Sequence, residues 1–236
     1  MNTNSNAYVM GFAVTMCVAV SAVLATLASA LKETQAAAAE FDRQKNVMMA
    51  AGLIQAGDTR SREDLEALFR ERITEVTVDT ETGAKIEGTA AEVSEKRKED
   101  PLRYRVVGTS KDDDGAVDTI ILPVSGKGLW STIYGYIALE SDKDHVRGIT
   151  FYKHGETPGL GGEVENPQWT GQWVGKSIRR DDGIGVIVKK GKVDPGVAKE
   201  KAHYVDGLAG ATITSNGVTK FVERDLRSFE AYLSKN

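Results

Sequence analysis

An apolar segment at the N-terminus constrains the fold more than any other feature of this chain. Residues 7–31 contain no Asp, Glu, Lys, Arg or His, and the first charged side chain is Lys32. A helix of this length would extend about 37 Å, at about 1.5 Å per residue, and a hydrocarbon core is about 30 Å thick. We therefore expect a single transmembrane helix that anchors the rest of the chain.

A cleaved signal peptide is the competing interpretation, because Ala28-Ser29-Ala30 resembles a cleavage site. However, the apolar segment is about twice as long as a typical signal core, and no Lys or Arg precedes it. A retained anchor is therefore favoured. The charges that flank the segment are too few and too balanced for the positive-inside rule to set its orientation.

Composition restricts what the rest of the chain can bind. A net charge of −4 argues against a nucleic-acid surface, which would need a basic face. The single cysteine, Cys17, cannot form an intramolecular disulfide or supply the thiolates of an iron–sulfur cluster. The three histidines are far apart, so we expect no metal site. A redox role would need an organic cofactor.

The sequence after the anchor predicts an α+β domain with an antiparallel sheet and flanking helices. Helical patterning covers 33 to about 72, with a break at Gly57-Asp58 and a second start capped by Ser61. Residues 80–101 are charged and poor in large apolar groups, which indicates a surface excursion. Strands are expected at 104–108, 117–124, 133–139, 146–152 and 185–189, the first two joined by a turn at 111–115. We divide the chain into 1–32, 33–100 and 101–236.

The C-terminal residues 215–234 predict an amphipathic helix. Val218, Val222 and Leu226 recur at four-residue steps, and other apolar residues extend the same face. Thr214 or Ser215 is expected to cap the start of the helix.

The segment from Asp206 to Ser215 precedes that helix and has the properties of a phosphate site. Gly207 and Gly210 permit tight turns, and the helix start offers free N–H groups and a positive dipole end. The hydroxyl of Thr212 would lie where a phosphate is stabilised. A glycine-rich cap of an ordinary helix would have a similar sequence, so the residues alone leave both interpretations open.

This segment resembles the Asp-Gly-x-Ser-Gly-Ala-Thr motif of the FMN-binding domains in ion-translocating respiratory complexes. Here it extends from Asp206 to Gly210-Ala211-Thr212. The resemblance implies that a flavin transferase attaches FMN through a phosphoester to Thr212. Ala209 stands where the motif has serine, which leaves the efficiency of attachment open.

Two further blocks are similar to the C subunit of the Na⁺-translocating NADH:quinone oxidoreductase. One is the glycine turn and aromatic strand 126–136, and the other is the loop 155–163 followed by Asn166-Pro167. Alternation places Tyr134 and Tyr136 on one face of the strand, and we expect at least one of them in the core. The resemblance implies contacts to the flavin ring from four residues, Trp130, Glu156, Thr157 and Leu160.

The resemblance also implies a function. The chain would carry electrons on its covalent FMN, within a membrane complex that couples NADH oxidation by quinone to Na⁺ export. It would have no catalytic residue of its own, would assemble with other subunits, and would be a single-pass protein of the bacterial inner membrane with a periplasmic domain. Two alternatives remain: the flavin subunit of the related ferredoxin:NAD⁺-oxidoreducing ion pump, and a flavin-free assembly or scaffold protein.

Overall fold

The computed structural model describes residues 5–112 and 114–235. Among these residues, α1 (Asn6–Ala50) is one helix long and apolar enough to cross a membrane, with a mean hydropathy of 2.1 in its most apolar window. Side chains in that window are not buried by the rest of the described chain. The long apolar helix predicted from residues 7–31 is therefore confirmed. The chain divides into two compact units, Met1–Asp42 and Arg43–Asn236.

The helices before the sheet follow the predicted pattern. The helix expected from residue 33 is the continuation of α1, and α2 (Arg62–Arg72) begins after an irregular loop. Ser61 caps α2, because its hydroxyl accepts a hydrogen bond from the Asp64 N–H at 3.1 Å. The cap at Ser61 is confirmed, whereas α1 ends at Ala50, before the expected break at Gly57-Asp58.

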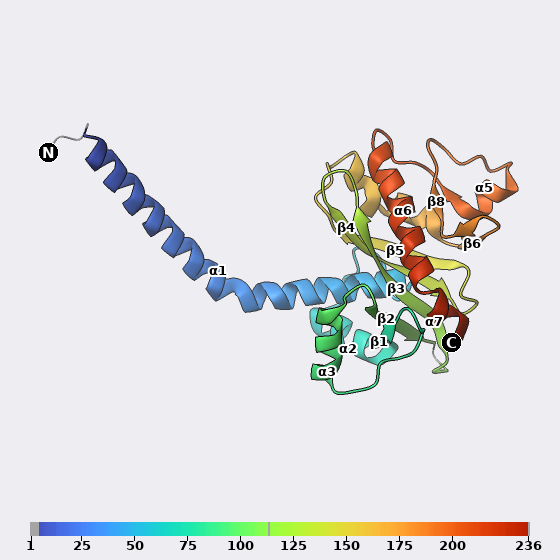
Figure 1. Ribbon diagram of the computed structural model, residues 1–236. Helices are drawn as coiled ribbons and strands as arrows, with labels where there is room; N and C mark the ends of the chain where they lie inside the picture. Colours follow the sequence, from blue (N-terminus) through green and yellow to red (C-terminus); the bar gives the residue numbers. More distant parts are fainter. Residues whose placement is uncertain (1–4, 113, 236) are drawn as a thin grey trace. The chain divides into compact units, whose positions relative to one another are not determined.

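A five-stranded antiparallel sheet forms the centre of the second unit, as predicted (Figure 1). Neighbouring strands follow one another in the sequence, so each connection joins adjacent strands. The strands are β1 (Ile73–Asp79), β2 (Tyr104–Lys111), β3 (Val117–Lys127), β4 (Thr132–Glu140) and β5 (Val146–Lys153). The predicted turn at 111–115 joins β2 to β3, although Asp113 lies outside the described residues.

Two elements at the start of the domain have no counterpart in the sequence prediction. Strand β1 is one of them: Ile73, Val76 and Val78 do not alternate evenly, so its signal is weak. The other is helix α3 (Ala90–Glu99), which lies within the expected surface excursion. None of the residues of α3 is buried, and Thr89 and Glu92 form a capping box at its start.

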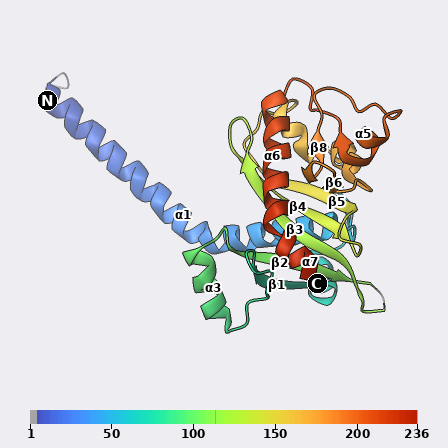
Figure 2. The same cartoon turned by 45° about the vertical axis from the view of Figure 1, so that its right-hand side comes forward.

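One face of the sheet is covered by α6 (Thr212–Ser228), which packs along β3 (Figures 1 and 2). Gly126 on β3 makes this approach possible, because a Cβ there would collide with the Phe221 side chain. Val218, Phe221 and Val222 of α6 are buried in the main core with Leu122, Val124 and Ile133 of the sheet. The helix that begins at Thr212 is thus held rigidly on the sheet.

The opposite face of the sheet receives the last turns of α1. The Thr150 hydroxyl donates to the Asn46 carbonyl at 3.1 Å, and the Arg147 guanidinium donates to the Ala51 carbonyl at 3.0 Å. Val47 and Met48 are fully buried there. The end of α1 is therefore part of the folded domain.

The segment between β5 and α6 consists of short elements. They are the 3-10 helices η1 (Gly161–Glu165) and η2 (Gly171–Trp173), the helices α4 (Pro167–Thr170) and α5 (Ala198–His203), and the strands β6 (Arg179–Arg180), β7 (Gly183–Ile184), β8 (Ile187–Val188) and β9 (Tyr204–Val205). Of the strand expected at 185–189, only Ile187–Val188 forms a strand, which is β8. Gly185 has a φ of +109°, which interrupts the extended chain between β7 and β8.

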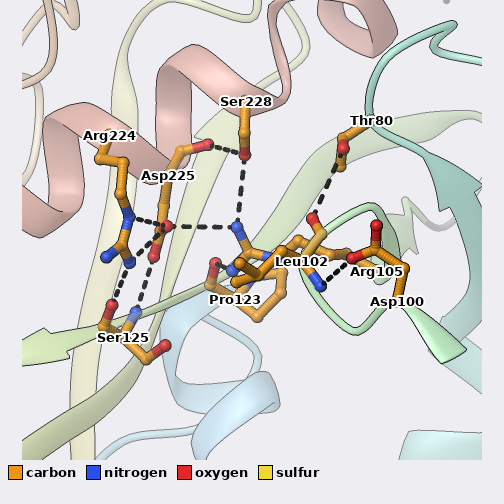
Figure 3. Close-up of polar contacts among 9 residues, drawn as sticks. All are labelled: Thr80, Asp100, Leu102, Arg105, Pro123, Ser125, Arg224, Asp225 and Ser228. Carbon is orange, nitrogen blue, oxygen red and sulfur yellow. Dashed lines mark hydrogen bonds and ion pairs between the residues drawn. The ribbon is translucent and has the colours of Figure 1, made fainter. Parts of the chain in front are cut away.

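A buried polar network fixes the far half of α6 to β3 (Figure 3). Strand β2 pairs with only part of β3, and side chains satisfy the backbone groups beyond that part. The Asp225 carboxylate accepts from the Ser125 N–H at 2.8 Å, and Arg105 donates to the Pro123 carbonyl at 2.7 Å. Arg105 and Asp225 form an ion pair at 3.2 Å, and both side chains are largely buried.

The two tyrosines of β4 do not lie in the core. Tyr134 is 38% exposed, and Tyr136 is half-buried and stacked on Tyr152 with ring centroids 5.4 Å apart. The prediction that at least one of them is a core residue is therefore wrong. Ile133 and Ile137 on the alternate positions of β4 are the buried ones.

Candidate functional site

Thr212 is the first residue of α6, and its side chain is exposed. The turn before it is tight, because Gly210 has a φ of +70° and the Ala211 N–H donates to the Leu208 carbonyl at 3.1 Å. Ala211 occupies the cap position, and among the described residues no side chain caps α6. The first N–H groups of a helix lack intrahelical acceptors, so the Thr212 hydroxyl lies at an electropositive helix end that suits a phosphate.

The two hydroxyls expected to cap the helix have other roles. Thr214 and Ser215 both lie inside the first turn of α6 and are buried. The Thr214 hydroxyl donates to the Glu156 carboxylate at 2.7 Å, and the Ser215 hydroxyl accepts from the Leu208 N–H at 3.1 Å. The predicted caps are therefore wrong. The helix starts earlier than predicted, because Gly210 allows the chain to turn directly before Ala211.

Glu156 is a buried carboxylate at the centre of the site. It accepts from three consecutive backbone N–H groups, those of Leu129 at 3.1 Å, Trp130 at 3.0 Å and Ser131 at 3.0 Å. Burial alone would raise its pKa, but the hydrogen bonds from the Thr214 hydroxyl and these N–H groups outweigh burial and hold the pKa below its usual value. Both carboxylate oxygens of Glu156 therefore accept hydrogen bonds from groups of the protein itself.

Exposed apolar side chains are brought to this region by the turn after β3 and by the loop after β5. Trp130 is 70% exposed although it is a large aromatic residue. Leu129 beside it, Leu160 in the loop and Ile213 beside Thr212 are exposed as well. A Cβ built on Gly210 would lie 2.8 Å from the Leu160 side chain, so Leu160 packs directly on the turn before Thr212. Such side chains form a suitable wall for a flat aromatic ring.

Thr157 is exposed in the same loop, and its backbone shapes the loop. The Thr157 carbonyl accepts from the Leu160 N–H at 3.1 Å and from the Gly162 N–H at 2.9 Å. These two bonds form a compact turn that presents Leu160 outward.

Asp206 forms hydrogen bonds through both its side chain and its backbone. Its carboxylate accepts from the Val193 N–H at 2.8 Å, and its carbonyl accepts from the Trp169 indole N–H at 2.8 Å. Asp206 therefore ties the start of the motif to the neighbouring loop and to the core. Among the described residues, no group of His, Cys, Asp and Glu has the arrangement to hold a metal ion.

The comparisons with known proteins agree with this geometry. Residues 128–227 match the model of the FMN-binding domain. The chain is 38% identical to the C subunit of the Na⁺-translocating NADH-quinone reductase from Pseudomonas aeruginosa, over 99% of this chain and 97% of that protein. It is 35% identical to the corresponding protein from Yersinia pestis, over 94% of this chain and 86% of that protein.

Two crystal structures have the same fold. The structure of NqrC from Shewanella oneidensis has a TM-score of 0.71 and 29% identity, and the match covers 84% of this chain and 98% of that one. The structure of the C subunit of the Na⁺-translocating NADH-quinone reductase from Parabacteroides distasonis has a TM-score of 0.69 and 29% identity, covering 87% of this chain and 98% of that one.

Proposed function

This chain belongs to the family of the C subunit of the Na⁺-translocating NADH-quinone reductase, and we propose from that membership that it carries FMN covalently on Thr212. The chain would be a flavoprotein subunit of an oxidoreductase complex. The names of its relatives support the Na⁺-translocating complex over the ferredoxin-dependent pump, and the FMN-binding domain supports a flavoprotein over a scaffold.

The different surroundings of Thr212 and Thr214 support Thr212 as the attachment position. Thr212 is exposed at the uncapped start of α6, whereas Thr214 is buried and its hydroxyl is engaged by Glu156. A transferase can reach the first hydroxyl without unfolding the helix, and the helix end stabilises the phosphate that would result. Ala209, which stands where the motif has serine, is exposed.

The ring of the flavin would lie on the exposed apolar side chains next to Thr212. Trp130 supplies an aromatic wall, Leu160 supplies an aliphatic one, and the Thr157 turn holds Leu160 in place. FMN supplies the electron-transfer chemistry when it is bound, and the protein supplies attachment, orientation and the surroundings of the ring. No side chain of this chain is required as an acid, base or nucleophile during electron transfer.

The place of the subunit in the complex follows from the same proposal. Helix α1 is long and apolar enough to cross a membrane, and it would anchor the chain in the bacterial inner membrane with the flavin domain in the periplasm. The domain receives electrons from one redox centre of a neighbouring subunit and passes them to another, while NADH and quinone bind elsewhere in a complex that exports Na⁺. In this proposal residues 1–32 form the anchor, 33–100 connect it to the domain, and 101–236 form the flavin domain. The model of the FMN-binding domain matches 128–227, which lie within the last part.

In-gel flavin fluorescence after denaturation tests the proposal, because a covalent flavin stays with the chain. Wild-type protein made together with its flavin transferase should give a fluorescent band, and protein made without the transferase should be folded but colourless. Thr212→Ala should remove the band. Thr214→Ala is the matched control and should keep it, since the gel reports the bond and not the position of the ring. A band that persists in Thr212→Ala, or disappears only in Thr214→Ala, would show that the wrong hydroxyl was chosen.

A further inference from the structure

The Glu156 carboxylate joins two parts of the candidate site that are distant in the sequence. One oxygen accepts from the N–H groups of Trp130 and Ser131, and the other accepts from the Leu129 N–H and from the Thr214 hydroxyl. Thr214 is 58 residues away from Glu156. The turn after β3 and the first turn of α6 are thus bound to the same buried group.

Two glycines leave the space that this arrangement needs. A Cβ built on Gly128 would lie 2.6 Å from the nearer Glu156 carboxylate oxygen. A Cβ built on Gly161 would lie 2.7 Å from the Thr214 hydroxyl and 2.8 Å from the other carboxylate oxygen. Any larger residue at either position would force the carboxylate out of its place.

An ionised carboxylate is well suited to this position. Hydrogen bonds to a charged acceptor are shorter and about twice as strong as bonds between neutral groups. The turn itself is closed independently, because the Gly128 N–H donates to the Ser131 carbonyl at 2.9 Å. Glu156 binds the N–H groups of this turn on one side and the Thr214 hydroxyl on the other, so it links the whole turn to α6.

We propose that Glu156 is a positioning residue that fixes the turn carrying Trp130 against the first turn of α6, with Thr214 as the contact on the helix. The proposal rests on the proposed function, since it concerns the wall beside a flavin attached to Thr212. Trp130 is 70% exposed, so the core does not hold its ring in place. When the Glu156–Thr214 contact is broken, the wall moves relative to the attachment point while the covalent bond to Thr212 stays intact.

The ratio of native to denatured flavin fluorescence tests this proposal in the full-length flavinylated protein. A flavin stacked on an indole ring is quenched, and denaturation releases it, so the ratio reports how closely Trp130 covers the ring. Glu156→Gln removes the charge of the carboxylate, and Thr214→Val removes only the hydroxyl. Both variants should raise the ratio by about two- to tenfold. Loss of one stacking contact lowers the population of stacked flavin by about this factor.

Two control variants separate positioning from general stability. Thr214→Ser restores a hydroxyl at the same place and should keep the wild-type ratio. Asp225→Asn loosens the far half of α6, where it contacts Ser125 and Arg105, and should lower the melting temperature with the ratio unchanged.

An unchanged ratio in either Glu156→Gln or Thr214→Val would overturn the proposal, and so would an equal rise in Asp225→Asn. Thr214→Val keeps the test valid if Glu156→Gln fails to fold. A wild-type chain without a fluorescent band after denaturation would instead contradict the attachment of FMN, which is a failure of the proposed function and not of the positioning role.

Discussion

At the scale of single residues, two buried carboxylates hold α6 on the sheet. Glu156 binds the helix at its first turn through Thr214, and Asp225 binds it at the far half through the Ser125 N–H. Each carboxylate satisfies backbone N–H groups that no strand partner reaches. A buried carboxylate is costly unless such partners are present, so both residues have a strong effect on stability.

Glu156 should make stability depend on pH in the acid range. Its pKa in the folded chain lies below the usual value of 4.5, so its contribution is present above that value and is lost as the pH falls through the folded pKa. The free energy of unfolding of the wild type should therefore fall more steeply than that of Glu156→Gln as the pH drops below about 5. Urea denaturation of the full chain in detergent measures both curves, and parallel curves would contradict this role.

Asp225→Asn should destabilise the domain strongly. The variant leaves the buried Arg105 guanidinium without its ion-pair partner, a change that costs about 3 kcal/mol in comparable buried pairs. Glu223→Gln on the same helix is the control, because its pair with Arg227 is partly exposed and should contribute less than about 1 kcal/mol. Urea denaturation measures the free energy of unfolding of both variants. Equal losses would contradict the larger contribution of the buried Arg105–Asp225 pair.

Some of these residues could be predicted from the sequence, and others could not. The tight turn at Gly210, directly before Thr212, was predicted because the residues that form it are adjacent in the sequence. The partnership of Glu156 with Thr214 joins residues 58 positions apart, and no local pattern encodes such a contact. The capping rule misplaced Thr214 for the same reason, since a distant carboxylate takes the hydroxyl that the rule assigned to the helix end.

At the scale of elements, α6 lies close to β3 because glycines replace side chains at the contact. A Cβ on Gly217 would collide with the Lys127 carbonyl, and one on Gly126 would collide with Phe221. The amphipathic pattern predicted the buried face of this helix correctly. The amphipathic pattern did not indicate how closely α6 approaches β3, because that distance depends on the backbone of β3.

Gly217→Ala should therefore lower stability although alanine favours helices. The gain in helix propensity is about 1 kcal/mol, whereas a forced shift of α6 away from Lys127 costs about 1–3 kcal/mol. We expect a net loss, with a lower melting temperature. Asn216→Ala, at an exposed neighbouring position of α6, should be neutral or slightly stabilising. A melting temperature that rises in Gly217→Ala would show that the helix is not tightly packed there.

The antiparallel sheet was predicted from the sequence, but some of the strands were not. Strands β2 to β5 contain apolar residues in segments separated by turns, and these were recognised. Strand β1 was missed because its apolar residues are unevenly spaced, and the strand expected at 185–189 was too long because the interruption at Gly185 is a backbone feature. Pairing with a neighbouring strand stabilises these elements, and the local sequence does not.

At the scale of the whole molecule, the chain consists of an apolar unit and a folded unit that share one helix. Residues up to Asp42 belong to the first unit, and the last turns of α1 belong to the core of the second. The membrane segment and the domain can therefore be separated by deletion, provided that the end of α1 is kept.

A chain that begins at Lys32 should stay in solution without detergent and unfold cooperatively, whereas the full chain should sediment with membranes. A chain that begins at Gly52 is the matched control. It lacks the buried Val47 and Met48 and the carbonyl that binds Thr150, so it should melt at a lower temperature or fail to fold. Ultracentrifugation and thermal unfolding measure both properties. Equal stability of the two truncated chains would contradict the assignment of the end of α1 to the core.

The position of the flavin is the central claim, and peptide mass spectrometry tests it most directly. Wild-type protein made with its transferase is digested with trypsin, and the peptide 202–220 contains Thr212, Thr214, Ser215 and Thr219. Our account predicts a mass raised by one FMN joined with loss of water, and fragment ions that place the added mass on Thr212. An unmodified peptide, or an added mass on any of the other hydroxyls, would contradict it.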